Sequence, residues 1–297
     1  MLIPAMRSRA LDTTLLAEQI QEIASDSESM AVALYDYEHA LAWSYQGDRW
    51  SHAASTIKVA VLYGLYAAID ERRFGPHRRL HVRNRFASAC DGVPFRVSPA
   101  RDGNSDVHAA LGKTMRLSEL ATHMITTSSN LATNLLIDLV GLDYTREVLE
   151  RASIGGVELV RGVEDDAAFD AGINNRVTAN GMVRLFRAIH ESWGVSPLAT
   201  SDMLEILFMQ QFRSGIPAGL PAAARDKARI AHKTGEISTA AHDAGIVFVA
   251  GRKPYVLAVL TEHEPDSGKH MAPVAKVSAA VYEWLIAADP PAAEQCV

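Results

Sequence analysis

Cysteine is scarce in this chain, and there is no surplus of positive charge. Only two of the 297 residues are cysteines, Cys90 and Cys296, and they lie far apart. A disulfide framework is therefore not expected. Lys and Arg number 29 against 35 Asp and Glu, which gives a net charge of -6. This balance lacks the basic footprint of a nucleic-acid-binding protein, so no nucleic-acid partner is expected.

Long apolar runs are also missing. The first nine residues are followed by an amphipathic stretch rather than by an unbroken apolar segment with a small-residue cleavage site. No signal peptide, membrane span or membrane partner is therefore predicted. The expected location is the cytoplasm, or the periplasm or exterior if a leader has been removed. The composition, 48% hydrophobic and 22% charged, is that of a soluble globular protein with a sizeable core.

The eleven histidines are scattered, and neither they nor the cysteines show metal-ligand spacing. No metal and no cofactor are predicted. Nothing in the pattern specifies an oligomeric state.

Hydrophobic periodicity predicts strands near both ends of the chain and helices between them. The predicted strands cover 30–37, 41–45, 228–234, 242–250 and 255–262. The predicted helices cover 13–23, the segment after Ser55, 117–126, 131–140, 144–151, 179–192, 198–211 and 274–287. Residues 157–175 are predicted to be a structured loop.

This order predicts an α/β (α+β) fold. Residues 1–53 and 212–297 are expected to form an antiparallel sheet flanked by helices, and residues 54–211 an inserted helical domain. Within the insert, residues 72–113 are rich in Arg, Gly, Pro and Asp. This stretch is predicted to be a loop with local hairpins that forms one wall of a pocket.

A serine and a lysine stand three residues apart at the start of a helix that is apolar nearly all round. Ser55 and Lys58 then share a helix face. A buried lysine that has lost its proton can act as the base that activates a serine hydroxyl. By itself the pair is equally consistent with a capping serine and a solvated lysine.

Two later motifs carry polar groups suited to the same chemistry. Ser128, Ser129 and Asn130 interrupt the helical pattern, where a hydroxyl can pass a proton or cap the next helix. Lys233 and Gly235 are expected at the end of a strand, where they offer a positive charge and close approach for a ligand. The alternative is an edge-strand lysine followed by a turn glycine.

Taken together and in this order, the three motifs resemble those of the serine β-lactamase and penicillin-binding protein superfamily. The flanking segments 129–136 and 232–247 are most similar to the class A branch. The resemblance extends from about Met30 to the C-terminal helix. It implies a sheet domain and a helical domain with the active site between them.

The resemblance also implies roles for individual residues. Ser55 would be the nucleophile, Lys58 its base and Ser128 the proton relay. Backbone N–H groups of Ser55 and Glu236 would stabilise the oxyanion. The residues implied to bind or orient the substrate are Asn130, Asn134, Lys233, Thr234, Gly235 and Glu236.

The chain departs from the class A pattern in three places. Ser129 stands where the second motif usually has aspartate, and the interval from Ser55 to Ser128 is longer than expected. Glu164 is at about the right distance to be the carboxylate that activates the hydrolytic water, but the usual Glu-Pro-Glu-Leu-Asn pattern is absent. Glu164 is therefore either the deacylation base or a solvated loop carboxylate.

The predicted function is that of a serine hydrolase that acts through an acyl-enzyme on an amide, with a β-lactam as the small-molecule substrate. The missing pattern around Glu164 and the missing leader favour a related esterase or peptidase. A protein that is acylated once and not turned over, as in penicillin-binding sensors, is the third possibility.

Overall fold

A five-stranded antiparallel sheet organises the computed structural model, which describes residues 11–75, 77–265, 268 and 270–288. Its strand order is β10-β11-β12-β1-β2. These strands are β1 (Ser29–Asp36), β2 (Leu41–Tyr45), β10 (Arg229–Ile237), β11 (Ala240–Phe248) and β12 (Tyr255–Glu262). The N-terminal hairpin joins the C-terminal meander where β1 pairs with β12, from Ser29 opposite Glu262 to Asp36 opposite Tyr255. Both ends of the chain thus build one sheet, and the predicted fold class is confirmed.

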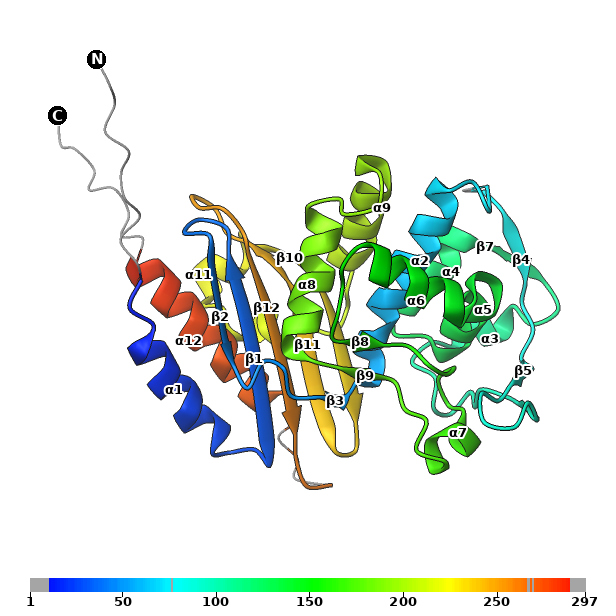
Figure 1. Cartoon of the computed structure of the whole chain (residues 1–297), viewed down its shortest axis with the longest axis horizontal. Coiled ribbons are helices and arrows are strands. Elements are labelled where there is room, and N and C mark those ends of the chain that lie inside the picture. The colour runs from blue at the N-terminus through cyan, green and yellow to red at the C-terminus, as the bar shows by residue number, and fades with distance from the viewer. Residues whose placement is uncertain (1–10, 76, 266–267, 269, 289–297) are drawn as a thin grey trace, which may run out of the picture.

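Helices make up most of the remaining regular structure (Figure 1). They are α1 (Thr14–Ala24), the 3₁₀ turn η1 (Ala54–Ile57), α2 (Lys58–Asp70), α3 (Ser105–Ala109), α4 (Leu117–Thr126), α5 (Asn130–Val140), α6 (Leu142–Arg151), α7 (Asp166–Asp170), α8 (Ala179–His190), α9 (Pro197–Phe208), α10 (Ile216–Gly219), α11 (Ala222–Arg225) and α12 (Ala272–Ala288). The short strands are β3 (Ser51–His52), β4 (Arg79–His81), β5 (Phe86–Ala87), β6 (Pro94–Phe95), β7 (Thr114–Arg116), β8 (Val157–Glu158) and β9 (Arg176–Val177).

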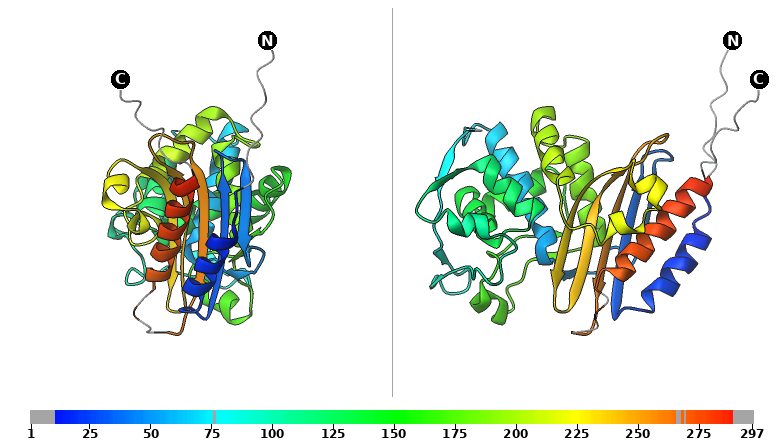
Figure 2. Two further views of the ribbon diagram at one scale, coloured as in Figure 1. Left: turned by 90° about the vertical axis from the view of Figure 1, so that its left-hand side faces the viewer. Right: turned by 180° about the vertical axis from the view of Figure 1, so that it is seen from behind.

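The period-two pattern of the strands separates two cores. Val32 and Leu34 of β1 face α1 and α12, which lie side by side on one side of the sheet (Figure 2). Ala31 and Ala33 face the opposite way, where α8 packs across the sheet. Small side chains on that face allow the helix to approach closely.

The larger core is continuous from the α8 face of the sheet into the helices around α2. Helix α2 contacts α4, α5, α6, α8 and α9 and is buried from Lys58 to Ala68. This agrees with its apolar sequence. Helix α8 lies within the segment predicted to be the helical insert, yet it packs on the sheet. The predicted division of the chain at residues 54 and 211 stays a prediction.

Segment 72–113 contains four short elements, β4, β5, β6 and α3, joined by irregular chain. The β5–β6 pair is the kind of local hairpin that was predicted there. The segment predicted as a loop at 157–175 contains β8 and α7. Among the described helices, none has the length and apolar character needed to cross a membrane.

Candidate active site

Ser55 lies in the 3₁₀ turn η1, directly before the buried helix α2 that starts at Lys58. The turn packs against β10 and β11. Gly235 of β10 makes this contact possible, because a Cβ there would lie 2.9 Å from the backbone nitrogens of Ser55 and Thr56. Such a distance is a steric clash, so the strand can meet the turn only at a glycine.

Three residues of the site have a positive φ although they are not glycines. The φ angles are 45° at Ala54, 61° at Ser128 and 59° at Glu164. Each such conformation costs of order 1–3 kcal/mol and persists only where the surrounding structure imposes it. Backbone strain therefore accompanies the nucleophile candidate, the relay candidate and the loop carboxylate.

Lys58 is completely buried. Its Nζ lies 2.6 Å from the carbonyl oxygen of Ser128, 2.7 Å from Oδ1 of Asn130 and 3.0 Å from Oγ of Ser128. Burial lowers the pKa of Lys58 well below its usual value, and the charge of Lys233 lowers it further. A lowered pKa favours the neutral amine, which can accept a proton from a neighbouring hydroxyl.

Ser128 connects the two lysines of the site. Its Oγ lies 3.0 Å from Nζ of Lys58 and 3.1 Å from Nζ of Lys233. A hydroxyl both donates and accepts hydrogen bonds. Ser128 can therefore take a proton from one neighbour while it gives its own proton to a substrate.

Lys233 is also completely buried, and its Nζ donates to the carbonyl oxygen of Thr234 at 2.7 Å. Burial lowers the pKa of Lys233 to about 7, although the carboxylate of Asp243 opposes this shift. The sequence predicted that this strand ends at Thr234. Instead β10 continues to Ile237, because its pairing with β11 extends to Ile237 opposite Ala240. The third motif thus lies within an edge strand.

Asn130 joins the lysine to the loop carboxylate. Its Oδ1 accepts from Lys58, and its Nδ2 donates to Oε1 of Glu164 at 2.7 Å. The other oxygen of Glu164 accepts from the backbone N–H of Ser98 at 2.9 Å, and Nε of Arg101 lies 3.7 Å away. The Glu164 side chain is only 5% exposed. Of the two alternatives for this residue, a solvated loop carboxylate is therefore excluded.

Asn134 does not belong to this contact network. Its Nδ2 donates to the carbonyl oxygen of Val163 at 2.9 Å, and its Oδ1 accepts from the N–H of Val163 at 2.8 Å. This corrects the expectation that Asn134 orients the substrate or Lys58. Both ends of its amide are engaged in holding the backbone next to Glu164.

The aspartate expected at Ser129 is replaced by a carboxylate from another segment. Asp102 accepts from the N–H groups of Asn130 and Leu131, both at 2.9 Å, and from Oγ of Ser129 at 3.2 Å. His108 lies 3.0 Å from the same carboxylate. The N-terminus of α5 thus gains a buried anion that binds its free N–H groups.

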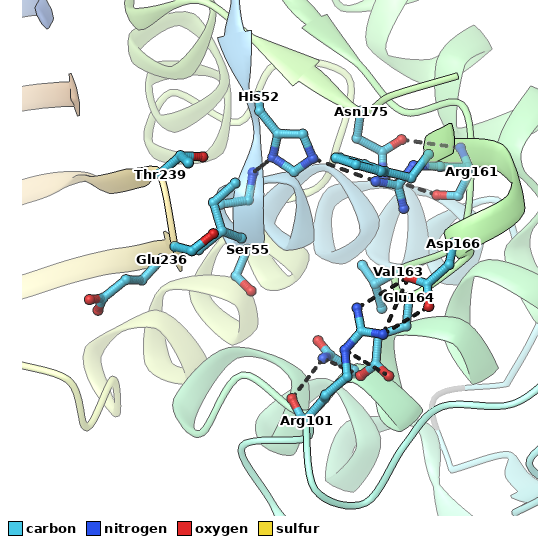
Figure 3. Close-up of a pocket in the computed structure, with 15 residues that line it drawn as sticks. His52, Ser55, Arg101, Arg161, Val163, Glu164, Asp166, Asn175, Glu236 and Thr239 are labelled. Atoms are coloured by element: carbon cyan, nitrogen blue, oxygen red, sulfur yellow. Dashed lines mark hydrogen bonds and ion pairs between the residues drawn. The ribbon is translucent and has the colours of Figure 1, made fainter. Parts of the chain in front are cut away.

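A cavity of about 470 Å³ lies beside Ser55. One side is formed by Ser55 and by Glu236 to Thr239, and the opposite side by Arg101, Glu164 and Asp166 (Figure 3). The predicted contribution of segment 72–113 to a pocket wall agrees with the position of Arg101. The cavity is large enough for a small-molecule substrate.

The residues that the sequence reasoning missed include His52 and Arg161, which line the cavity, and the buried Asp102, which binds the N-terminus of α5. For Asp102 the only signal was the serine at position 129, which left the N-terminus of α5 without its usual carboxylate. His52 and Arg161 carried no signal, because neither belongs to a motif. Among the described residues, no group of three or more His, Cys, Asp or Glu side chains could hold a metal ion, and Cys90 is an exposed free thiol.

Ser55 at the cavity with the buried Lys58 on the same helical turn, the bridging Ser128 and Lys233 on a strand together define a serine hydrolase of the β-lactamase type. The profile of the beta-lactamase enzyme family matches residues 15–285. The chain therefore belongs to the beta-lactamase enzyme family. No curated protein matches the sequence.

Solved structures share the fold over nearly the whole chain. A mutant of PBP-A in an acyl-enzyme complex with penicillin G is 25% identical, with a TM-score of 0.77, and the match covers 92% of this chain and 96% of that one. A β-lactamase from Sphaerobacter thermophilus is 24% identical, with a TM-score of 0.77 and coverage of 95% and 100%. An ancestral class A β-lactamase is 24% identical, with a TM-score of 0.76 and coverage of 90% and 99%.

Proposed function

We propose that this hydrolase opens the amide bond of β-lactams through an acyl-enzyme on Ser55. The main supporting observation is the environment of Lys58. This lysine is buried, faces two carbonyl-type acceptors and is close enough to Lys233 for that charge to lower its pKa. Such a lysine is suited to take the proton of a serine one turn away.

In the acylation step, the proton of Ser55 Oγ moves to Lys58 as Oγ attacks the lactam carbonyl. The oxyanion is stabilised by the N–H groups of Ser55 and Glu236, which the close contact at Gly235 brings together. The C–N bond then breaks, and Ser128 passes the proton from Lys58 to the departing nitrogen. Lys233 and Thr234 bind the carboxylate on the leaving-group side.

In the deacylation step, water attacks the ester and gives its proton to Glu164. Glu164 has a positive φ, which is a strained backbone conformation. Its carboxylate is held by Asn130 and Ser98. These contacts keep the carboxylate oriented, which supports the role of general base. The acid is released, and the proton held by Glu164 is transferred to Ser55 Oγ, so that both groups regain their starting protonation states.

A second candidate function is penicillin binding without turnover. Both oxygens of Glu164 already accept a hydrogen bond, and Arg101 lies beside one of them. If these contacts leave no position for a hydrolytic water, the acyl-enzyme would persist. The penicillin G acyl-enzyme of the PBP-A mutant is a precedent for such a species on this fold.

The test is to mix the protein with benzylpenicillin and to follow both product release and protein mass. A hydrolase gives continuous turnover, and quenching traps a transient penicilloyl adduct on the peptide that contains Ser55. A binder gives one equivalent of adduct without turnover. No adduct on any peptide, or an adduct that survives in Ser55→Ala, would contradict the proposal.

A further inference from the structure

Two hydrogen-bond donors face each other at one end of the cavity. Nδ1 of His52 accepts the backbone N–H of Ala54 at 3.0 Å, so it carries no proton. Burial and the charge of Arg161 lower the pKa of His52 to about 4, so the ring is neutral at pH 7 with its proton on Nε2. Nε2 lies 3.5 Å from Nη2 of Arg161. A guanidinium has only donors, so neither group can accept a hydrogen bond from the other.

Arg161 is a buried cation without a paired anion. Only 6% of the residue is exposed. Its Nη1 donates to the carbonyl oxygen of Gly162 at 3.0 Å and its Nη2 to Oδ1 of Asn174 at 3.1 Å, both neutral acceptors. Its Nε is buried without a hydrogen-bond partner, and among the described residues no carboxylate forms an ion pair with it. A buried charge without an ion-pair partner is unfavourable, and an incoming anion would relieve it.

The nearby carboxylates are engaged elsewhere. Asp165 accepts from the N–H groups of Ala168 and Ala89. Asp166 is bound by Arg101, with Nη1 at 2.9 Å from Oδ2. Neither carboxylate therefore neutralises Arg161, although both lie close enough to raise its pKa slightly against the larger effect of burial.

The two donors belong to the same cavity as Ser55. Figure 3 shows His52 and Arg161 on the side away from the Arg101–Glu164 contact. The ring of Phe169 also lines the cavity, 6.0 Å from the ring of His52 and 5.6 Å from the guanidinium carbon of Arg161. Since Phe169 is 48% exposed, it offers an apolar surface that leads from the open cavity to the donors.

We propose that His52 and Arg161 form a subsite for a carboxylate at the far end of the acyl side chain. This inference rests on the proposed acylation of Ser55. The preferred acyl donor then carries an anion on each side of its scissile carbonyl. One is bound by Lys233 and Thr234, and the other is bound by the His52–Arg161 pair across an aliphatic spacer that packs on Phe169.

The test compares acyl side chains that differ only in their terminal group. Derivatives of 6-aminopenicillanic acid with glutaroyl and adipoyl side chains are paired with the pentanoyl and hexanoyl derivatives, which lack the second carboxylate. The second-order acylation rate of Ser55 should favour one of the diacids by about tenfold or more, the usual contribution of a hydrogen bond to a charged group. Added salt should reduce this preference.

Variants then assign the preference to the two residues. Arg161→Gln should bring the diacid-to-monoacid ratio close to one. His52→Asn keeps an acceptor for the N–H of Ala54 but lacks the Nε2 donor, so the ratio should fall by a smaller factor. Arg176→Gln is the matched control, because Arg176 pairs with Glu158 outside the cavity, and its ratio should equal that of the wild type.

Equal acylation rates for all four side chains in the wild-type protein would overturn the subsite while the proposed function stands. Acylation by none of them would instead contradict the proposed function. A diacid preference that survives His52→Asn and Arg161→Gln unchanged would also overturn the assignment. If Arg161→Gln does not fold, the wild-type ratio and His52→Asn decide the question.

Discussion

The two sides of the cavity are built in different ways. Ser55, Lys58 and Lys233 lie on buried regular elements, the η1 turn with α2 and the strand β10. The opposite side consists of irregular chain around residues 98–104 and 161–166, held by side chains that bond to backbone groups. The first side, called the rigid side below, carries the nucleophile and the base proposed for acylation, and the loop side carries Glu164, proposed for deacylation, and Arg161 of the proposed subsite. Changes on the two sides should therefore affect different steps.

The largest effect is expected on the rigid side. Lys58→Met removes the proposed base, and acylation should slow by about 10²- to 10⁴-fold, the typical contribution of a positioned general base. Stopped-flow measurement of acylation by benzylpenicillin checks this. Lys276→Met is the control, since Lys276 is an exposed partner of Asp26. An unchanged acylation rate would assign the base to another group.

Glu164→Gln tests the loop side. The amide keeps the shape of the side chain but cannot take a proton from water, so deacylation should slow by about 10²-fold or more while acylation changes little. Mass spectrometry should then show accumulated acyl-enzyme. Glu158→Gln, on an ion pair with Arg176, is the control. Unaltered turnover in Glu164→Gln would exclude this carboxylate as the base.

Gly235→Ala tests the contact between β10 and the nucleophile turn. The added Cβ would lie 2.9 Å from two backbone nitrogens, so strand and turn must separate. A misplacement near 1 Å can cost about 10²-fold in rate, and acylation should fall by up to that factor in a folded protein. Gly75→Ala is the control, because a Cβ there meets nothing within 4 Å. Normal acylation would show that the turn tolerates the shift.

Asp102→Asn should weaken the contact between segment 72–113 and the N-terminus of α5. Loss of the charged acceptor for the N–H groups of Asn130 and Leu131 should reduce the free energy of unfolding by about 1.5–3 kcal/mol. Adding Ser129→Asp to this variant should recover part of the loss, because it restores a carboxylate at the same helix end. Urea denaturation measures both effects, with the exposed Asp106→Asn as control. No recovery in the double variant would contradict the equivalence of the two positions.

The smallest effect is a pH dependence. Lys233 must be protonated to bind a substrate carboxylate, and its pKa is about 7 in the free protein. The value of kcat/KM for benzylpenicillin should therefore fall as the pH rises above about 7. An ester substrate without a carboxylate should not show this alkaline decrease. A flat profile for benzylpenicillin up to pH 9 would contradict the assignment.

The rigid side could be predicted from the sequence because each of its residues belongs to a short local pattern. Ser55 and Lys58 are three residues apart on one apolar helix, and Lys233 precedes a glycine in a strand. The sheet was predictable for a similar reason, since strands such as 255–262 are continuous apolar runs bounded by turns. The error at the end of β10 arose because Gly235 and Glu236 are not typical strand residues, whereas pairing with β11 keeps them in the sheet.

The loop side could not be predicted because its contacts join residues far apart in the chain. Nothing near Asp102 indicates that it binds the N-terminus of α5, and Asn134 gives no sign that it holds Val163 rather than a substrate. The donor pair of His52 and Arg161 depends on a histidine tautomer, which is set by the N–H of Ala54. Such contacts become visible only when the fold brings the segments together.

The most direct test of this account is the protonation state of the buried lysines. NMR of the protein labelled with ¹⁵N at lysine Nζ should show two lysines that titrate far below 10.5, one lost in Lys58→Met and one near pH 7 lost in Lys233→Met. Lys58 should be the neutral one at pH 7, as a base for Ser55 requires. If the signal that disappears in Lys58→Met titrates near 10.5 instead, Lys58 is charged in the free protein, and the proposed acylation step is wrong.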